Sequence, residues 1–505
     1  MTIIFRTDAS QQIGSGHVMR CLTLADILKK RGTDVIFICR EHSGNLIWQI
    51  EAKDYAVLRL PQADIEYTAA PEDLAHAPWL GVSWEQDAVD TIAILGDIRP
   101  QWLIVDSYAI DRRWEQMLRP HVERIMVIDD LSDRPHDCDV LLDQNLYQAM
   151  EMRYEKLVPK SCHNLLGPRY ALLRTEFASA RKDLRQRDGH VRRILVFFGG
   201  VDPTNETEKT LQALAEISDR QFEVDVVVGI GNFHKEQIRN ICAVHEGFHF
   251  HCQVANMAEL MAAADLAIGA GGTATWERCA MGTPAILTVV ADNQKELAEA
   301  GARKGLFFYM GESHSVSSEK LLNVLKFSLC VPETLQYYSV NCLTFVDAKG
   351  GGRVANILFP PQIIIRQASL ADCDSVYEWR NAEETRRYIF NAEPISVEIH
   401  RSWYCNSLKN PNRILLIGEI DNKPVGVLRY DFSGDEALIS IYLVPGVQGA
   451  GVGSQLLRCG SQWVRENSRY IKVIKAEIFR DNIASIRAFE SAGYKEHHLI
   501  FQEAL

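Results

Sequence analysis

The chain has 505 residues, a net charge of −12, 47% hydrophobic residues and 24% charged residues. Its length predicts about two to four domains, and its acidic balance argues against a nucleic-acid partner, which needs clustered positive charge. No apolar run approaches the roughly 18–20 residues of a membrane span, and Met1 leads into TIIFRTDAS without a secretory pattern, so we expect a cytoplasmic protein with no membrane insertion.

Short apolar strands alternate with helical segments in the first third of the chain. TIIFRTD, DVIFICR, WLIVDS and RIMVIDD have the composition of buried strands, and residues 17–30 carry apolar side chains at helical spacing. Continuous apolar strands separated by helices are typical of a doubly wound parallel sheet. We assign residues 1–185 to this first Rossmann-like lobe.

The same alternation begins again after the charged stretch ARKDLRQRDGHVRR. ILVFFGG and FEVDVVVGIG are predicted strands, and DLAIGAGGTATWERCAMGTPAILTVV is predicted to form strand, glycine-rich turn, helix, turn and strand. We assign residues 186–358 to a second Rossmann-like lobe. Two such lobes predict a cleft in which ligands lie at the carboxyl ends of the strands.

The pattern changes after Pro360 and Pro361, which cannot continue a helix and indicate a linker. A strand at IIIRQAS and helices around DSVYEWRNAEETRRYI follow, and then strands at ILLIGEI, KPVGVLRYD and ALISIYLV. We therefore expect a third, smaller α/β domain over residues 362–505.

His17 follows Gly14, Ser15 and Gly16 at the point where the first strand gives way to a helix. The positive end of a helix favours the neutral imidazole, and that form serves as a general base near neutral pH. Glycines at this point would also let backbone approach a ligand closely. Taken alone, the segment fits equally well a simple turn in which His17 caps the helix.

A second glycine-rich turn lies in the second lobe. Gly271, Gly272 and Thr273 separate a strand from a helix, where a diphosphate would meet free N–H groups. Glu277, one turn further on, could accept hydrogen bonds from a ribose diol. Gly199 and Gly200 begin another loop whose backbone a ligand could approach closely, although turns between strand and helix favour glycine in any case.

The motifs D-x-S-x-x-I-G-x-G-H-V-M-R-C-L-x-L-A, GPRYALLR, FGGVDPTN and GAGGTATWERCAMGTP occur in this order over about residues 1–350. Together they resemble the UDP-2,4-diacetamido-2,4,6-trideoxy-β-L-altropyranose hydrolases of pseudaminic acid biosynthesis. That family is similar to the GT-B glycosyltransferases, especially the enzyme that adds N-acetylglucosamine to make lipid II, but uses water as acceptor. The resemblance implies inverting cleavage of a UDP-sugar with His17 as the base that activates water.

The same resemblance implies a set of substrate contacts. Ser15 and Gly16 would lie against the sugar diphosphate, and Gly271, Gly272, Thr273 and Glu277 would hold UDP. The remaining expected substrate-binding residues are Gly14, Asp106, Arg169, Gly199, Gly200 and Asn256.

No metal is expected at this site, because stabilising the departing UDP and positioning one water can suffice. The 12 cysteines form no C-x-x-C pair, which favours free thiols over disulfides or zinc. His249, His251 and Cys252 are close in sequence but lack a third-ligand motif, so we expect them to be structural. Asp106 ends a strand at the cleft edge, where it is an expected substrate contact and a possible second catalytic carboxylate.

The third domain carries Q-G-x-G-x-G directly after an apolar strand and before an amphipathic helix, in IYLVPGVQGAGVGSQLL. Such a loop turns successive N–H groups toward a pyrophosphate. With the later segment N-x-x-S-I-R-x-F-E-x-x-G-Y, it resembles the GNAT N-acetyltransferase superfamily over about residues 362–505. The expected fold is thus α/β, with two Rossmann-like lobes in GT-B arrangement followed by a GNAT acetyltransferase domain.

The GNAT resemblance implies acetyl-CoA as co-substrate. Its pyrophosphate would lie on the loop 448–454, and a backbone N–H near Tyr442 would polarise the thioester carbonyl. The expected acetyl-CoA contacts are Tyr442, Gln448, Gly449, Gly451, Gly453, Ser454 and Asn482. Many members protonate the departing thiolate with a tyrosine before the last glutamate, but this chain has Phe489 before Glu490, which leaves the general acid unassigned. Tyr494 occupies a position that usually packs into the core.

The pseudaminic acid pathway contains an acetyltransferase that makes the hydrolase's substrate, so this combination suggests two consecutive steps: 4-N-acetylation of a UDP-4-amino-sugar, then hydrolysis. The partners expected are a UDP-activated amino-sugar and acetyl-CoA. Two other interpretations remain open. The first 350 residues could form a true GT-B glycosyltransferase, and the GNAT domain could modify proteins or act as a non-catalytic sensor of CoA.

Overall fold

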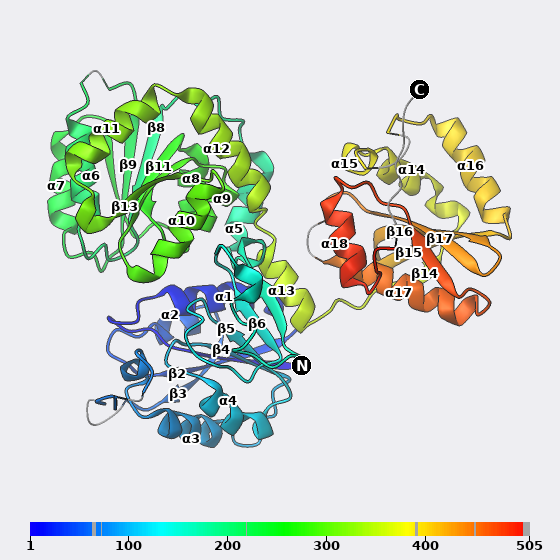
Figure 1. The fold of residues 1–505 in the computed structure, drawn as a ribbon, viewed down its shortest axis with the longest axis horizontal. Coiled ribbons are helices and arrows are strands. Elements are labelled where there is room, and N and C mark those ends of the chain that lie inside the picture. Colours follow the sequence, from blue (N-terminus) through cyan, green and yellow to red (C-terminus); the bar gives the residue numbers. More distant parts are fainter. Residues whose placement is uncertain (63–66, 72, 219, 389–391, 449–450, 498–505) are drawn as a thin grey trace. The chain divides into compact units, whose positions relative to one another are not determined.

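The computed structural model describes residues 1–62, 67–71, 73–218, 220–388, 392–448 and 451–497. Two compact units make up the chain, Met1–Val354 and Ala355–Leu505. The first unit contains two parallel sheets, and the second contains one mixed sheet (Figure 1). The expected α/β architecture is therefore confirmed. The domain limits drawn from the sequence stay predictions.

The first sheet has seven strands in the order β3-β2-β1-β4-β5-β6-β7, and all its pairs are parallel. Its central strands β1 and β4 are neighbours in which Thr7 pairs with Asp106 at the carboxyl ends. The loops that follow these two strands therefore leave the sheet side by side. The strands are β1 Thr2–Thr7, β2 Asp34–Arg40, β3 Ala56–Leu60, β4 Trp102–Asp106, β5 Ile125–Ile128, β6 Val140–Asp143 and β7 His163–Leu166.

Helices cover both faces of this sheet, as a doubly wound fold requires (Figure 1). All five residues of β4 are buried, and Trp114 and Leu118 pack beneath the sheet in the same apolar cluster. Buried strands of this kind explain why the apolar runs are continuous rather than alternating. The helices are α1 Gly16–Lys29, α2 Ile47–Glu51, α3 Trp84–Leu95, α4 Arg112–Leu118 and α5 Thr175–Ala180.

The second sheet has six parallel strands in the order β10-β9-β8-β11-β12-β13. Gly269 lies where β11 passes β8, and a Cβ there would come within 2.2 Å of the Phe197 carbonyl oxygen. This glycine is therefore required by strand packing. The strands are β8 Arg193–Phe197, β9 Glu223–Val228, β10 Phe248–Cys252, β11 Leu266–Ala270, β12 Ala285–Val289 and β13 Phe308–Glu312.

The helices of this lobe are α6 Glu206–Ala215, α7 Lys235–Val244, α8 Met257–Ala263, α9 Ala274–Ala280, α10 Lys295–Arg303, α11 Ser318–Leu329 and α12 Pro332–Phe345. Helix α13, Gly350–Leu358, then begins against the first lobe. A Cβ on Gly350 would come within 2.3 Å of the Ala171 carbonyl oxygen, and one on Gly351 within 2.5 Å of Ile27. The chain thus returns from the second lobe to the first at the start of α13.

The second unit has a five-stranded sheet in the order β14-β15-β16-β17-β18, in which only the last pair is parallel. Its strands are β14 Ile364–Gln367, β15 Arg413–Ile420, β16 Lys423–Ser433, β17 Glu436–Leu443 and β18 Val473–Ala476. Its helices are α14 Cys373–Asn381, α15 Glu383–Arg386, α16 Val397–Lys409, α17 Val452–Asn467 and α18 Ile483–Ser491. No helix in the described ranges combines the length and apolar character needed to cross a bilayer.

Candidate functional site

The loop between β1 and α1 presents an open stretch of backbone. Gly14 has φ +78° and its N–H donates to the Ser10 carbonyl oxygen, which closes a tight turn. Ser15 is the N-cap of α1, and its hydroxyl makes no capping bond. A Cβ added at Gly14 or Gly16 would meet nothing within 4 Å, so a ligand could approach this backbone closely.

His17 lies in the first turn of α1 and is 6% exposed. Its Nδ1 is 2.6 Å from Oδ1 of Asp106, the last residue of the neighbouring strand β4. Asp106 is fully buried and ionised, so its carboxylate can only accept, and Nδ1 of His17 must carry the proton. In the neutral imidazole, the other ring nitrogen, Nε2, is then the acceptor.

Arg20 fixes Asp106 with two hydrogen bonds of 2.6 Å, from Nε to Oδ2 and from Nη2 to Oδ1. Burial opposes ionisation of Asp106, but Arg20, and after it His17, outweigh burial and hold the pKa of Asp106 well below its usual range. The Cys21 thiol also donates to Oδ2. Asp106 therefore faces its supporting residues, and none of its surface is open to a substrate.

Tyr108 and Asp130 extend this network. Arg20 Nη1 lies 3.2 Å from Asp130 Oδ2, and the Tyr108 hydroxyl donates a short hydrogen bond to Oδ1. Burial, followed by the charge of Asp130, raises the pKa of Tyr108, so this phenol stays protonated. Its ring meets the His17 imidazole edge to face, with centroids 4.6 Å apart. The imidazole is therefore held on two sides.

Sequence reasoning missed Arg20, Tyr108 and Asp130. Arg20 carried a usable signal, because it lies three residues after His17 and hence on the same face of α1. Asp130 carried no such signal in the sequence, because only the order of the strands brings the loop after β5 toward α1.

In the second lobe, the expected residues gather at the turn between β11 and α9. The Gly271 N–H donates to Oε1 of Gln294, 3.2 Å away, while Gly272 and Thr273 lead into α9. The Glu277 carboxylate lies 3.4 Å from Arg174 Nη2. Burial raises the pKa of Glu277, and Arg174 opposes this.

The loop after β8 lies at the same edge of the second sheet. Gly199 has φ +96°, a backbone conformation that favours glycine. A Cβ added at Gly199 or Gly200 would have no neighbouring atom within 4 Å. A Cβ on Gly229 would fall 2.4 Å from the Gly200 carbonyl oxygen, so the two loops pack backbone against backbone.

Two expected contacts lie away from both turns. Arg169 is in the 3-10 turn Pro168–Tyr170, where its guanidinium lies over the Tyr170 ring and its carbonyl oxygen accepts from Arg353. Asn256 is the exposed N-cap of α8, and its side chain donates to Glu259, 3.2 Å away.

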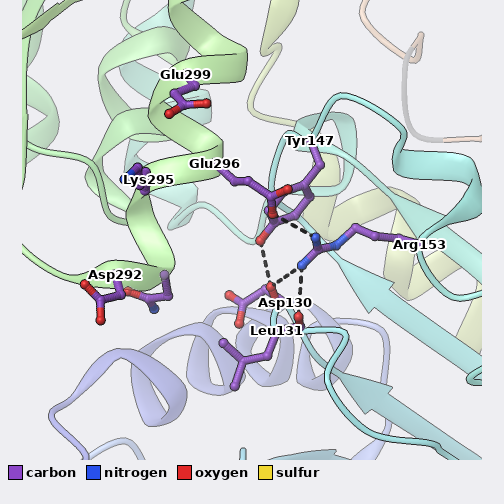
Figure 2. A pocket seen from close by; sticks show the side chains of 9 residues that line it. Asp130, Leu131, Tyr147, Arg153, Asp292, Lys295, Glu296 and Glu299 are labelled. Carbon is purple, nitrogen blue, oxygen red and sulfur yellow. Dashed lines mark hydrogen bonds and ion pairs between the residues drawn. The ribbon is translucent and has the colours of Figure 1, made fainter. Parts of the chain in front are cut away.

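A cavity of about 300 Å³ lies between the two lobes of the first unit. Figure 2 shows Arg153 and Tyr147 from the first lobe facing the start of α10 in the second. Arg153 Nη1 forms an ion pair of 3.1 Å with Glu296, and its guanidinium carbon lies 3.4 Å from the Tyr147 ring centre. Asp130 also lines this cavity, so the His17 network reaches its wall. The sequence singled out none of these lining residues, because they follow no motif.

His249 and His251 are each paired with a carboxylate across β9 and β10. His249 Nε2 lies 2.6 Å from Glu223, and His251 Nε2 lies 2.8 Å from Asp225. Within the described ranges, no three side chains of the His, Cys, Asp or Glu type gather closely enough to hold a metal ion.

The second unit has an opening in its sheet. β17 pairs with β18 only from Glu436 to Ile439, although β17 continues to Leu443. The backbone of residues 440–443 therefore faces no strand on that side. Tyr442 belongs to this free stretch and packs against the apolar cluster around Tyr404 and Val427; burial raises its pKa.

The glycine loop of this unit leads from β17 into α17. Gly451 has φ +82° and is the N-cap of α17, while Gly453 and Ser454 lie in its first turn. A Cβ on Gly453 would make only ordinary contact with Leu443, 3.7 Å away. Gln448 precedes the loop, and Gly449 lies outside the described residues.

Helix α18 contributes the last expected contact. The Asn482 side chain is its N-cap and accepts from the Ser485 N–H at 3.1 Å. Phe489 is 5% exposed and meets Tyr494 edge to face. The Tyr494 hydroxyl is 2.8 Å from Ser461 Oγ, and burial raises its pKa. Tyr494 is thus held in the core by its hydrogen bond with Ser461.

Some known proteins resemble one part of this chain, and one resembles nearly its whole length. Residues 194–330 match the glycosyltransferase family 28 C-terminal domain, and residues 373–494 match the acetyltransferase (GNAT) family. An uncharacterized protein of Methanocaldococcus jannaschii is 24% identical, with 98% of this chain and 97% of that protein covered. The UDP-2,4-diacetamido-2,4,6-trideoxy-beta-L-altropyranose hydrolase of Campylobacter jejuni is 28% identical over 52% of this chain and 81% of its own length.

Among solved structures, MurG of Acinetobacter baumannii has a TM-score of 0.50 at 12% identity, over 71% of this chain and 98% of its own. At that identity the likeness concerns the fold, and it matches the two parallel-sheet lobes to a GT-B arrangement. With the two family matches, this confirms the expected combination. The chain is an enzyme that joins a GT-B-like part, homologous to a sugar-nucleotide hydrolase, to a C-terminal GNAT acetyltransferase domain.

Proposed function

We propose that residues 1–185 and 186–358 together hydrolyse a UDP-linked 2,4-diacetamido sugar, with His17 as the general base. The observation that carries this proposal is the arrangement around His17. A buried, ionised carboxylate accepts a hydrogen bond from its Nδ1–H, which leaves Nε2 of the neutral imidazole as a proton acceptor.

In the proposed reaction, Nε2 of His17 takes a proton from water, and the water oxygen attacks the anomeric carbon. The bond between that carbon and the UDP oxygen breaks, and UDP leaves with the electron pair. Attack opposite to the leaving group inverts the configuration of the anomeric carbon. Asp106 holds the imidazole and balances the charge it gains, so we assign Asp106 to positioning His17 rather than to contact with substrate.

The nucleotide end is proposed to bind at the second lobe. The backbone of Gly271, Gly272 and Thr273 would receive the diphosphate, and Glu277 would accept the ribose hydroxyls. Support for this comes from the place of Glu277 in α9, one turn after Thr273, and from Arg174, which opposes the rise in pKa that burial gives Glu277. Ser15 and Gly16 would contact the diphosphate from the first lobe.

The second unit is proposed to acetylate the 4-amino group of the UDP-amino-sugar precursor with acetyl-CoA. The amine attacks the thioester carbonyl, the carbon–sulfur bond breaks, and CoA leaves as its thiol after gaining a proton. The unpaired end of β17 offers backbone N–H groups to the carbonyl, and the loop at Gly451 and Gly453 fits a pyrophosphate. Because Tyr494 is held by Ser461, we assign no side chain as the proton donor.

One experiment tests both reactions in order. The full chain is supplied with the UDP-4-amino-sugar and acetyl-CoA, and mass spectrometry follows the products with time. We expect the mono-acetylated UDP-sugar to gain one acetyl group first, and then free diacetamido sugar and UDP to appear. Acetylation without UDP release contradicts the hydrolase assignment. Transfer of the sugar to an added acceptor, with none to water, favours a glycosyltransferase instead.

A further inference from the structure

A continuous chain of hydrogen bonds joins the His17 network to the nucleotide turn of the other lobe. Asn145, in the loop after β6, donates from Nδ2 to Oδ2 of Asp130, 3.1 Å away. The indole N–H of Trp276, in α9, donates to Oδ1 of Asn145 at 3.0 Å. Asp130 is the same carboxylate that receives Arg20. The path from α9 to the imidazole is therefore unbroken.

The direction of every bond in this chain is fixed by chemistry. An indole nitrogen can only donate, and an ionised carboxylate can only accept, so the Asn145 amide has one orientation that satisfies both neighbours. Arg20 only donates, to Asp130 on one side and Asp106 on the other. A side chain at position 145 therefore needs both an acceptor and a donor to keep the connection.

Both ends of this chain are shielded from water, whereas Asn145 and Asp130 in its middle are partly buried and Asp130 lines the cavity. Trp276 is fully buried, Arg20 is 7% exposed and Asp106 is fully buried. Hydrogen bonds in such surroundings hold their geometry more tightly than bonds on the surface. Trp276 precedes Glu277, the residue assigned above to the ribose, so the chain begins where the nucleotide would bind.

We infer that Asn145 and Trp276 are positioning residues that couple docking of the nucleotide helix α9 to the placement of His17. With α9 docked, Trp276 holds Asn145, which keeps Asp130 against Arg20 and so keeps Asp106 beneath the imidazole. The base is then fully placed only when the UDP-binding lobe is engaged. This inference rests on the proposed hydrolase function.

The test compares Trp276→Phe with Trp114→Phe in the full chain. Trp276→Phe removes the N–H that reaches Asn145, together with part of the buried ring volume. Trp114 is a matched control, because it is also fully buried and its indole N–H also makes a 3.0 Å bond, to Asp87 within the first lobe. We expect Trp276→Phe to lower kcat for UDP-sugar hydrolysis about tenfold, with KM and UDP affinity within about twofold, and Trp114→Phe to leave kcat near wild type.

Asn145→Ala provides a second variant that does not alter the core around Trp276. It should lower kcat by a similar factor, and the double variant Asn145→Ala/Trp276→Phe should be no slower than Asn145→Ala alone, since both changes cut the same chain. A double variant whose loss of kcat is the product of the two single losses would overturn the inference. So would a Trp276→Phe enzyme with the same kcat as Trp114→Phe.

A readout without catalysis separates this inference from the proposed function. With nitrogen-15-labelled histidine, and His17→Asn to identify its signals, addition of UDP to the wild type should sharpen the Nδ1–H resonance of His17. The same addition to Trp276→Phe should leave it broad. If the wild type hydrolyses no UDP-sugar but shows this difference, the coupling stands and the hydrolase assignment fails. An identical response in both proteins refutes the coupling.

Discussion

The two candidate sites of this chain differ in whether side chains or backbone form them. In the first unit, His17, Asp106, Arg20 and Asp130 form a buried network of side chains, each held by the next. In the second unit, the site is mostly backbone: the unpaired end of β17 and the glycine loop before α17. The difference indicates that hydrolysis depends on exact placement of one base, whereas acetyl transfer depends on the shape of the main chain.

The largest effect should come from removing the base. His17→Asn keeps a polar side chain of similar reach but cannot take up a proton, so hydrolysis should fall by about 10³-fold. Acetylation by the second unit and UDP affinity should stay within about twofold. Initial rates of UDP release and of CoA release, measured on the same preparation, check this. Hydrolysis near the wild-type rate would remove His17 from its assigned role.

Asp106→Asn should have the next largest effect. The amide removes one of the two charged partners of Arg20 and no longer requires His17 to carry its proton on Nδ1, so kcat for hydrolysis should fall roughly a hundredfold. Asp188→Asn is the matched control, because Asp188 is half exposed and pairs only with Arg192 at the surface. Equal kcat values in the two variants would mean that Asp106 does not position the base.

The buried charges should also make the stability of the first unit depend on pH. Burial alone lowers the pKa of His136, but Glu115 and then Asp129 outweigh it and raise the pKa to about 9. The charged imidazole therefore stabilises the fold fully below its ordinary pKa of about 6.5, and this contribution is lost as pH rises through 9.

Denaturant unfolding at pH 6.5 and pH 9.5 measures this contribution. The free energy of unfolding of the first unit should fall by about 3 kcal/mol between these values. His136→Gln should lower the free energy of unfolding at pH 6.5 and remove most of the difference between the two pH values. A wild-type unit equally stable at both values would show that His136 carries no charge in the fold.

The smallest effect should come from the backbone site. Gly451→Val places a branched side chain at φ +82° and fills the approach to the loop, so KM for acetyl-CoA should rise about tenfold. Gly434→Val supplies a control for strain alone, because Gly434 has φ +61° and open space around it in the turn between β16 and β17. Hydrolysis should not change in either variant. A similar rise in KM for acetyl-CoA in both variants would contradict the assignment of this loop to acetyl-CoA binding.

These two kinds of site also differ in how far the sequence reveals them. The glycine loop and the strand before it are local, so the sequence predicts their positions directly. It also predicts β1, β2, β4, β5 and α1 nearly as they occur, because their apolar runs are continuous. It misses the short strands β3 and β7, whose residues are only partly buried and carry a weak apolar signal.

The side-chain network is harder to predict because its members are far apart in sequence. His17 stands in a recognisable turn, but Asp106 joins it only because β4 lies beside β1. Its position at a strand end suggested contact with substrate, whereas burial and Arg20 place it beneath the base. Asn145 and Trp276 lie in different lobes, and nothing local marks either as a partner of the other.

Hydrolysis in oxygen-18-labelled water tests the central claim most directly. The wild-type chain is incubated with the UDP-diacetamido sugar, and the products are examined at once by mass spectrometry and proton NMR. We predict one labelled oxygen on the anomeric carbon of the first-formed sugar, inverted configuration there, and unlabelled UDP. Label in the UDP phosphate, or retained configuration at the sugar, would contradict direct attack by a water that His17 activates.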